Sequence, residues 1–596
     1  MIEPDRPVEP LRVGVMLDAL QVPAWIARIL RQLLRADFVH LALVVLNGET
    51  PAAPRTLDRL RRPRRDRLLF NLYHRLDSRI FRSTPDAFAP EDMADELVGV
   101  PAITAEPSRP KPFEHRFSAE TVDEIRAARL DVAVRFGFNI IRGDILDVAR
   151  YGVWSYHHGD HREYRGVPAL FWEMYEGNPV SGTMLQVLEE QLDAGRVLYR
   201  SFSATDKLSL NRGSNRAYWK SAEFVIRCLT MLHERGWDYL ASRPEYLETV
   251  SYNKPIYRSP TNGQTLRFLL RTAVGALVRQ LDKRLVEYQW HIAYRRTPDS
   301  RENAARELPP GGSVQEYPFR LVGAPPGRWY ADPTVVEDRG RHHLFFEDYD
   351  MIRETGGISW LTLKEGLPTA ARSVLAREYH MSYPFVFRWE DAWYMTPETG
   401  ANRTVELWRA TEFPEQWELE RVLLADVDAV DPTAFAHDGR FYLFVNLAVP
   451  GASLDDELCL FHADSPGDTL LPHPLNPVVS DVRRARPAGG VFVHDGMLIR
   501  PSQDCSQRYG GLTVFNWITT LSQTEYAEEP IGQLGPTWLR GSVATHTFNG
   551  TAVYQVVDAQ RRELRLLRRT RSALGRRCRS GMCSGPSRTT SRSASR

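Results

Sequence analysis

Residues 155–198 read SYHHGDHREYRGVPALFWEMYEGNPVSGTMLQVLEEQLDAGRVL, and this stretch decides how the N-terminal part of the chain folds. Two adjacent histidines, His157 and His158, open a loop that carries a Tyr-Arg-Gly triplet seven residues after the first of them. An apolar run with helical character follows, and then a short alternating segment typical of a strand. The stretch closes on Leu-Asp-Ala-Gly at 192–195. We therefore expect a loop, a helix and a strand in this order.

The order of these motifs resembles that of the folate-dependent formyltransferases, which include the methionyl-tRNA, glycinamide ribonucleotide and sugar N-formyltransferases. Their shared pattern is Asn-x-His, a loop that ends in Tyr-Arg-Gly, a helix, a strand with Gly and Thr, and Leu-Asp-x-Gly. The matching positions in this chain are His157, Tyr164-Arg165-Gly166, Gly182-Thr183 and Leu192-Asp193-x-Gly195. Ser155 stands where the family has Asn. The resemblance implies a doubly wound α/β domain with a Rossmann-type sheet.

The resemblance also implies a reaction and a set of site residues. Formyl transfer from 10-formyltetrahydrofolate to an amine needs a neutral amine and a stabilised tetrahedral oxyanion. His157 would donate a hydrogen bond to that oxyanion, and Asp193 would orient the imidazole and relay the proton. Ser155 would be a partial oxyanion donor of shorter reach, and losing one such donor commonly costs about 10²–10³ in rate. The segment expected to form the cofactor wall is Phe136, Gly137, Phe138, Asn139 and Ile140.

Composition narrows the class of protein. The chain has 596 residues, 76 basic against 75 acidic, with 43% hydrophobic and 25% charged residues, which is ordinary for a soluble protein of several domains. The net charge of +1 argues against a nucleic-acid partner. Five scattered cysteines without a CxxC pair favour a reducing compartment and no metal site. No signal peptide and no membrane-spanning run is apparent, so we expect a cytoplasmic protein.

The first fifty residues support an α/β domain. Leu11–Asp18 is a largely apolar run that predicts a buried strand, Val22–Leu34 has apolar residues at helical spacing, and His40–Leu46 predicts a second strand. This β-α-β order suits a doubly wound parallel sheet. No G-x-G-x-x-G follows the first strand, so a dinucleotide site is not supported. A basic run at 59–67 could contact phosphates or simply face solvent.

A long segment joins the two halves of the chain. Gln264–Tyr294 has an apolar side at helical spacing, and we interpret it as an interdomain or dimer helix, which would make the protein a homodimer. Its arginines leave a membrane-surface helix as an alternative. The polar segment Pro298–Val314 that follows predicts a linker.

Five related segments follow, beginning at Ala331, Ser382, Val430, Arg486 and Ala544. Each reads as a strand, an Asp/Gly turn and an aromatic-rich strand, and the turns recur about every fifty residues. This period predicts a five-bladed β-propeller. The units resemble the propellers of the arabinanase and fructosidase clan of glycoside hydrolases and the N-terminal region of plant glucosamine inositol phosphorylceramide transferases.

Such propellers place carboxylates in a central funnel, one as a base and one as an acid. Asp332 and Asp431 match base-like positions of the first and third units, and Glu398 is a candidate acid. Tyr383 and Arg486 stand at the corresponding positions of the second and fourth units. Tyrosine and arginine there suit binding of a sugar or phosphate better than hydrolysis. Alternatively, each Asp-Pro simply starts a strand.

The sequence therefore predicts four parts. These are a formyltransferase-like domain at 1–245, a helical linker at 246–314, an all-β five-bladed propeller at 315–566 and a disordered basic tail at 567–596. The predicted activity is formyl transfer to an amine on an amino sugar or related metabolite. Two alternatives stay open: a catalytically decayed transferase with a glycan-binding propeller, and a glycosidase or glycosyl-transfer protein that acts through the propeller.

Overall fold

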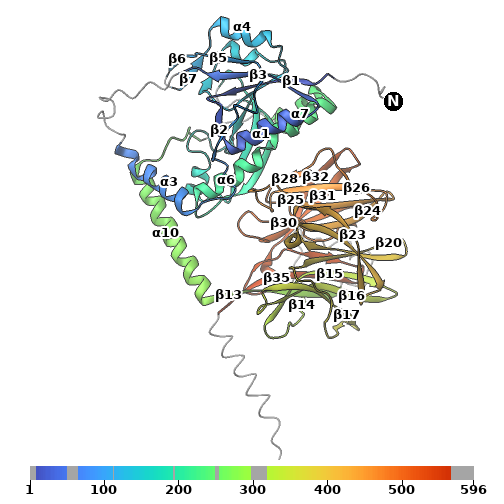
Figure 1. The fold of residues 1–596 in the computed structure, drawn as a ribbon. Coiled ribbons are helices and arrows are strands. Elements are labelled where there is room, and N and C mark those ends of the chain that lie inside the picture. Colours follow the sequence, from blue (N-terminus) through green and yellow to red (C-terminus); the bar gives the residue numbers. More distant parts are fainter. Residues whose placement is uncertain are drawn as a thin grey trace, which may run out of the picture.

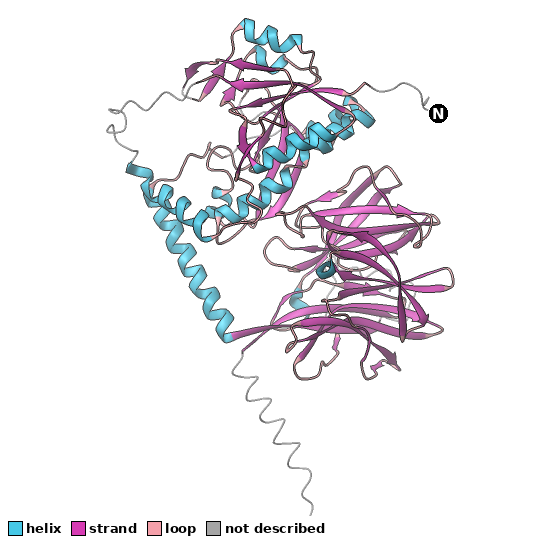
Figure 2. Cartoon of the chain, viewed as in Figure 1, coloured by secondary structure: helices cyan, strands magenta, loops and turns pink. Residues whose placement is uncertain are grey.

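The computed structural model describes residues 9–49, 65–111, 113–191, 195–248, 254–296 and 318–564. An N-terminal α/β region and a C-terminal region of antiparallel sheets pack against each other, and a long helix runs along their edge (Figures 1 and 2). The predicted linker at 298–314, the tail from 567 and most of the basic run at 59–67 lie outside the described residues.

The N-terminal region is built on a seven-stranded sheet. Its order is β12 (Arg196–Ala204), β11 (Val180–Val187), β10 (Val153–His157), β8 (Val132–Arg135), β1 (Leu11–Leu17), β3 (Val39–Asn47) and β5 (Ala102–Ala105). The five strands from β10 to β5 are parallel, and β11 and β12 are antiparallel to their neighbours. The chain builds outward from β1 on one side and then returns to add β8 and β10 on the other. The α/β prediction for this region is confirmed.

Helices cover both faces of this sheet. Val15 of β1 packs with α1 (Ala24–Arg35) and α7 (Phe224–Arg235), whereas its neighbour Met16 packs with α4 (Ala119–Ala127) on the opposite face. Because successive side chains of a strand point to opposite faces, burial on both sides requires the continuous apolar run read from the sequence.

Smaller elements complete this region. They are β2 (Gln21–Pro23), β4 (Pro90–Asp92), β6 (Ser108–Lys111), β7 (Glu114–Arg116), β9 (Ile140–Ile141), α3 (Leu68–Ile80), α5 (Phe171–Glu176), α6 (Leu210–Ser221), α8 (Trp237–Ser242) and α9 (Pro244–Leu247).

The segment predicted as one helix and a linker is partly a strand. Helix α10 spans Asn262–Leu285, and β13 (Val286–Arg296) follows it directly. The helical prediction to Tyr294 was therefore wrong over its last part. The residues from Val286 are rich in β-branched and aromatic side chains, and all eleven of them pair with β35 (Tyr554–Leu564). This long-range pairing overrides the helical pattern.

The C-terminal region contains five antiparallel sheets in chain order. The first holds β15 (Arg328–Asp338), β16 (Arg341–Asp350), β17 (Thr355–Lys364), β18 (Leu367–Pro368) and β19 (Arg372–Leu375), and the second β20 (Ser382–Trp389), β21 (Ala392–Thr399), β22 (Thr404–Glu412) and β23 (Gln416–Ala425). The third holds β24 (Asp428–His437), β25 (Arg440–Ala448), β26 (Glu457–Ala463), β27 (Leu471–Pro472) and β28 (Val479–Ser480). The fourth holds β29 (Phe492–His494), β30 (Met497–Asp504), β31 (Leu512–Leu521) and β32 (Tyr526–Leu534), and the fifth β13, β14 (Arg320–Leu321), β33 (Ser542–Ala544), β34 (Phe548–Gly550) and β35.

The first two long strands of the first four sheets meet in two-residue hairpins, as the repeat predicts. Their paired residues are Asp338 with Arg341, Trp389 with Ala392, His437 with Arg440, and His494 with Met497. The first loop residue has a φ of 47–51° in each of the four. Such left-handed turns match the twist of the flanking strands. The fifth turn, at Gly550, is longer.

A second shared feature lies inside β15, β20 and β24. Asp332, Tyr383 and Asp431 each precede a proline, interrupt the strand register and have a φ of 52°, 44° and 51°. A left-handed backbone is unfavourable for these residue types and persists only where the surroundings enforce it. Three equivalent positions thus share a costly conformation that re-aims their side chains.

Buried ion pairs join the two regions. Lys220 of α6 donates a hydrogen bond to Asp456 over 2.9 Å, and both side chains are 1% exposed. Arg227 of α7 binds both carboxylate oxygens of Glu457 at 2.6 and 2.9 Å. Charges this deeply buried require paired geometry, so these contacts fix the orientation of one region against the other.

Among the helices that the structure describes, none combines the length and the apolar character needed to traverse a bilayer.

Candidate active site

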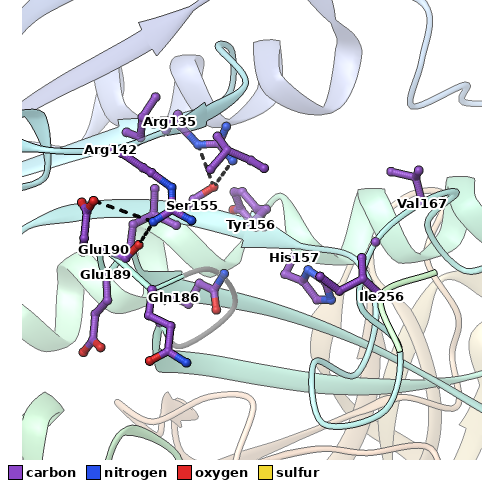
Figure 3. A pocket seen from close by; sticks show the side chains of 16 residues that line it. Arg135, Arg142, Ser155, Tyr156, His157, Val167, Gln186, Glu189, Glu190 and Ile256 are labelled. Atoms are coloured by element: carbon purple, nitrogen blue, oxygen red, sulfur yellow. Dashed lines mark hydrogen bonds and ion pairs between the residues drawn. The ribbon is translucent and has the colours of Figure 1, made fainter. Parts of the chain in front are cut away.

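A cavity of about 350 Å³ opens at the carboxyl ends of β8 and β10. Its lining includes Ser155, His157 and Arg135, with Gln186 of β11 opposite them (Figure 3). Open parallel sheets place ligands at this edge, next to the point where the strand order reverses. In this sheet the reversal lies between β1 and β8.

Arg135 and Ser155 are direct partners across β8 and β10. The Arg135 guanidinium donates to Ser155 Oγ from Nη2 over 2.9 Å and from Nε over 3.2 Å (Figure 3). Its Nη1 donates to the carbonyl oxygens of Phe138 and Asn139 at 2.9 and 2.7 Å. The arginine therefore holds both the serine hydroxyl and the loop that follows β8.

This arrangement changes what Ser155 can do. A hydroxyl offers one proton and two acceptor positions, and Arg135 uses the acceptor side. The hydroxyl proton is then left to donate, and Ser155 lines the cavity. Burial lowers the pKa of Arg135 to about 10, because the low dielectric disfavours the charged form. A buried cation that bonds only neutral oxygens favours an anion nearby.

His157 is held by its own loop. Its Nε2 lies 3.0 Å from the carbonyl oxygen of Tyr164, which can only accept, so Nε2 carries a proton. Nδ1 is then the ring nitrogen that can take up a proton. A side chain at Gly159 would come within 3.1 Å of His157 Nε2 and 2.9 Å of the Tyr164 oxygen, which explains the glycine after the two histidines.

His158 has a different role from its neighbour. Its ring stacks on Tyr218 at a centroid distance of 3.6 Å and an angle of 5°. Burial lowers the pKa of His158 to about 3. It is therefore a neutral packing residue at the pH of a cell.

Glu173, on α5, is a buried carboxyl beside the histidine loop. It is 1% exposed, and its Oε1 lies within 3.7 Å of the position that a Gly159 side chain would take. Burial raises the pKa of Glu173 to about 8, so the carboxyl carries a proton near neutral pH. A pKa in this range suits acid–base work, although the chemistry needs the group to reach the cavity.

The other motif glycines make room for backbone. A side chain at Gly166, whose φ is 105°, would lie 2.1 Å from the carbonyl oxygen of Tyr257. A side chain at Gly182 would lie 2.9 Å from the backbone of Asp160. The Tyr-Arg-Gly triplet and the Gly-Thr strand thus allow the histidine loop to pack closely on its neighbours.

The predicted site residues are placed as follows. Ser155 and His157 lie together at the cavity, and Asp193 lies outside the described residues. Ile140 also lines the cavity. Phe136 packs against Trp25 and Tyr156. Phe138 is buried beside His115 and Phe117, Gly137 abuts Asp18, and Asn139 bonds His115. The cofactor-wall assignment stays a prediction.

A second polar cluster joins the five sheets of the C-terminal region. Arg486 donates to Asp431 over 2.6 Å and to Asp455 over 3.0 Å, and its Nη2 lies 3.6 Å from Glu398. Gln503 donates to the same Asp431 oxygen over 2.9 Å. Burial raises the pKa of Asp431 to about 7. Asp431, Glu398 and Arg486, expected to share a site, therefore do lie together.

Asp332 lies in a neighbouring part of this cluster. His546 contacts Asp558 over 2.7 Å through Nδ1 and Asp332 over 3.3 Å through Nε2. Although burial disfavours its charge, Asp558 and Asp332 raise the pKa of His546 to about 9. The ligand atoms of these three side chains lie close enough to hold a metal ion. In the structure the His546 imidazole bridges the two carboxylates as an ion-pair triad.

Comparison with known proteins separates the two regions. Residues 322–562 match the family profile described as glucosamine inositolphosphorylceramide transferase 1, N-terminal. The enzyme of that name from Oryza sativa subsp. japonica is 32% identical over 243 residues, which is 40% of this chain and 32% of the relative. Methionyl-tRNA formyltransferase of Bartonella bacilliformis is 27% identical over 174 residues, 29% of this chain and 53% of the relative. The N-terminal region is thus similar to formyltransferases. The C-terminal region, which we call the transferase-1-like region, is similar to the N-terminal part of glucosamine inositolphosphorylceramide transferase 1.

The transferase-1-like region is the C-terminal one, and the chain spans about a third of the length of the curated relatives that match it. Among solved structures, the family 117 glycoside hydrolase Zg3597 of Zobellia galactanivorans matches with a TM-score of 0.28 and 12% identity. That match covers 39% of this chain and 84% of the hydrolase.

Sequence reasoning missed several residues in both regions. In the formyltransferase-like region they are Arg135 and Glu173; in the C-terminal region they are His546 and Asp558. Arg135 left a signal, because a charged residue ends the otherwise apolar strand Val132–Arg135. Glu173 and Asp558 left no such signal in the sequence, because each lies in a segment whose pattern is that of an ordinary helix or strand.

Proposed function

We propose that this protein transfers a formyl group from 10-formyltetrahydrofolate to the amine of an amino sugar. The observation that carries the proposal is the cavity at the ends of β8 and β10, where Arg135, Ser155 and His157 converge in the formyltransferase-like region. The residues fit a polar co-substrate. Gln186 lines the cavity and its buried Oε1 has no partner among the described residues, while Arg135 brings a positive charge to the cavity wall.

The residues would divide the work as follows. The acceptor nitrogen attacks the formyl carbon, and negative charge develops on the formyl oxygen. Ser155, with its acceptor positions held by Arg135, donates its hydroxyl proton to that oxygen, and the guanidinium charge strengthens the donor. His157 was expected to donate to the oxyanion, but its Nε2 proton is held by the Tyr164 carbonyl, so its Nδ1 instead takes the proton that the amine loses. The carbon–nitrogen bond to the donor then breaks, and the Nδ1 proton passes to the departing nitrogen.

The roles of two other parts of the predicted site rest on the resemblance to the formyltransferases. Asp193 would orient His157, and the segment Phe136–Ile140 would form one wall for the pteridine. An amino-sugar acceptor is supported by the name of the relatives of the second region, which includes glucosamine. The balanced charge of the chain weighs against a tRNA acceptor.

Mass spectrometry tests the proposal directly. The full chain is incubated with 10-formyltetrahydrofolate and a panel of free and nucleotide-linked amino sugars. The expected result is a product heavier by one formyl group that disappears in His157→Ala. His158→Ala is the matched control, because the neighbouring imidazole stacks on Tyr218, bonds Ser221 and does not line the cavity. Formylation that persists in His157→Ala would contradict the assigned role, and no product from any amine would contradict the function.

We also infer that the five sheets form a five-bladed propeller whose centre binds a sugar. Its support is the hydrogen bonding that links the five sheets: the Tyr383 amide and the Thr547 hydroxyl donate to Asp332, and Arg486 and Gln503 donate to Asp431. A glycosidase is the second candidate. It is weakened because both aspartates are already bonded to other side chains. Release of nitrophenol from aryl glycosides, lost in Asp332→Asn, would favour hydrolysis over binding.

A further inference from the structure

Helix α10 is buried only near its N-terminus, and farther along it touches the protein through polar contacts of Arg271 and Asp282. A capping box formed by Thr261 and Gln264 starts the helix, and Thr265 and Phe268 are its only buried residues. Phe268 packs on Tyr73 and Phe171 with ring centroids 5.3 and 5.1 Å apart. Beyond these contacts the helix runs along the outer edge of the molecule to β13 (Figure 1).

The helix presents an apolar face to solvent. Seven large apolar side chains on it are between 47% and 61% exposed: Leu266, Leu270, Val274, Leu277, Val278, Leu281 and Leu285. At about 100° of rotation per residue, these positions fall within an arc of about 120°. The arc lies opposite Thr265 and Phe268, so it points away from the body.

Helix α3 carries a second exposed apolar row. It packs on α10 through Tyr73, and its four apolar side chains at a spacing of four residues are Leu68, Leu72, Leu76 and Ile80. These are between 45% and 70% exposed. We call the exposed apolar side chains of the two helices the helical ridge. Large exposed apolar patches mark interaction sites.

The charges around the helical ridge are of one sign. The basic side chains on the two helices are Arg75, Arg79, Arg267, Arg271, Arg279, Lys283 and Arg284. The two acidic ones are occupied elsewhere. Asp77 is buried and accepts from Ser209 and Asn211, and Asp282 accepts from Arg562 and Tyr288.

These charges indicate which partner can bind to the helical ridge. Two copies of the helical ridge facing each other would bring like charges together with no carboxylate of either helix free to pair with them, which opposes self-association. An anionic lipid surface satisfies both features, because acyl chains cover the apolar arc and headgroups neutralise the exposed cations on the same side of α10, Arg267 and Arg284. We infer that the helical ridge seats this protein on the surface of an anionic membrane, with α10 lying in the plane of the interface.

Vesicle flotation with the full chain tests this inference. The probes are vesicles of phosphatidylcholine with phosphatidylglycerol, and vesicles of phosphatidylcholine alone. The wild-type chain should bind the anionic vesicles, and added salt should weaken the binding because it screens the cations. Replacing Leu270, Leu277 and Leu281 by Gln, which keeps helix propensity, should weaken partitioning by at least about a hundredfold.

Two further variants complete the design. Ile352→Gln, Leu367→Gln and Leu471→Gln together form the matched control, because these side chains are 87%, 62% and 54% exposed on the other region and should not affect binding. Arg267→Gln with Arg284→Gln should reduce binding and its salt dependence while leaving the apolar side chains of the arc unchanged. Wild-type failure to bind anionic vesicles overturns the inference, as does equal loss in the matched control. A dimer in sedimentation that the leucine variant dissociates, without vesicle binding, would also overturn it in favour of self-association.

Discussion

Removing the ammonium group of Lys220 should loosen the junction between the two regions. In the structure, Lys220 donates to Asp456 and Ser203, and the side chains of Lys220 and Asp456 are 1% exposed. Lys220 and the Ser203 hydroxyl both donate to Oδ2 of Asp456, and its Oδ1 has no partner among the described residues. Lys220→Met therefore leaves a buried carboxylate uncompensated, which costs about 3–5 kcal/mol.

The magnitude and its pH dependence can both be measured. For a region of this size, that loss lowers Tm by about 6–20 °C. Burial already raises the pKa of Asp456, and Lys220 opposes that shift. Without the lysine the folded-state pKa rises further above its unfolded value. The neutral Asp456 carboxyl contributes its full stability below the pKa that it has in the unfolded chain. That contribution is lost as the pH rises through its pKa in the folded protein. The defect should therefore shrink in acid.

The double variant Lys220→Met with Asp456→Leu is the internal control. Replacing both partners of a buried pair with apolar residues is often neutral or stabilising, so it should recover most of the lost stability. Scanning calorimetry of wild type, both single variants and the double variant gives the comparison. A single variant that melts with the wild type, or a double variant no better than Lys220→Met, would refute the reasoning.

Three further outcomes follow from the site. Ser155→Ala and Arg135→Met should each lower the rate of formyl transfer by about 10²–10³. The double variant should lose little more, because the two residues act as one donor. Additive losses in the mass-spectrometric assay would show that their roles are separate. Glu173→Gln should match the wild-type Tm below a pH of about 4.5 and exceed it above pH 8. The pKa of the buried Glu173 carboxyl is raised to about 8, so the wild type loses the stabilising neutral form of this group as the pH rises. A Tm difference that stays constant across pH would contradict the assignment. Gly182→Ala should displace the histidine loop at Asp160 and reduce turnover, whereas Gly263→Ala, which meets nothing within 4 Å, should leave it unchanged.

The helices and strands of the N-terminal region were predictable because their signals are local. The apolar run at Leu11 became β1, and the helical spacing from Val22 became α1. The hairpins of the C-terminal region were equally local, since a two-residue turn and its aromatic strand are adjacent in sequence. His157 and Ser155 were found at the cavity for the same reason: an ordered motif within a few tens of residues fixes a strand end and its loop.

The sequence by itself thus determined the order of elements, the α/β class of the first region, the repeat of the second and the motif at His157. Tertiary structure alone decided which distant groups meet. Only the return of β35 made Val286–Arg296 a strand, and only the register of β8 on β10 put Arg135 on Ser155. Only the packing of the two regions buried Lys220 against Asp456. The physical reason is that backbone preferences and periodicity act over a few residues, whereas burial, pairing and pKa depend on neighbours that chain separation does not reveal.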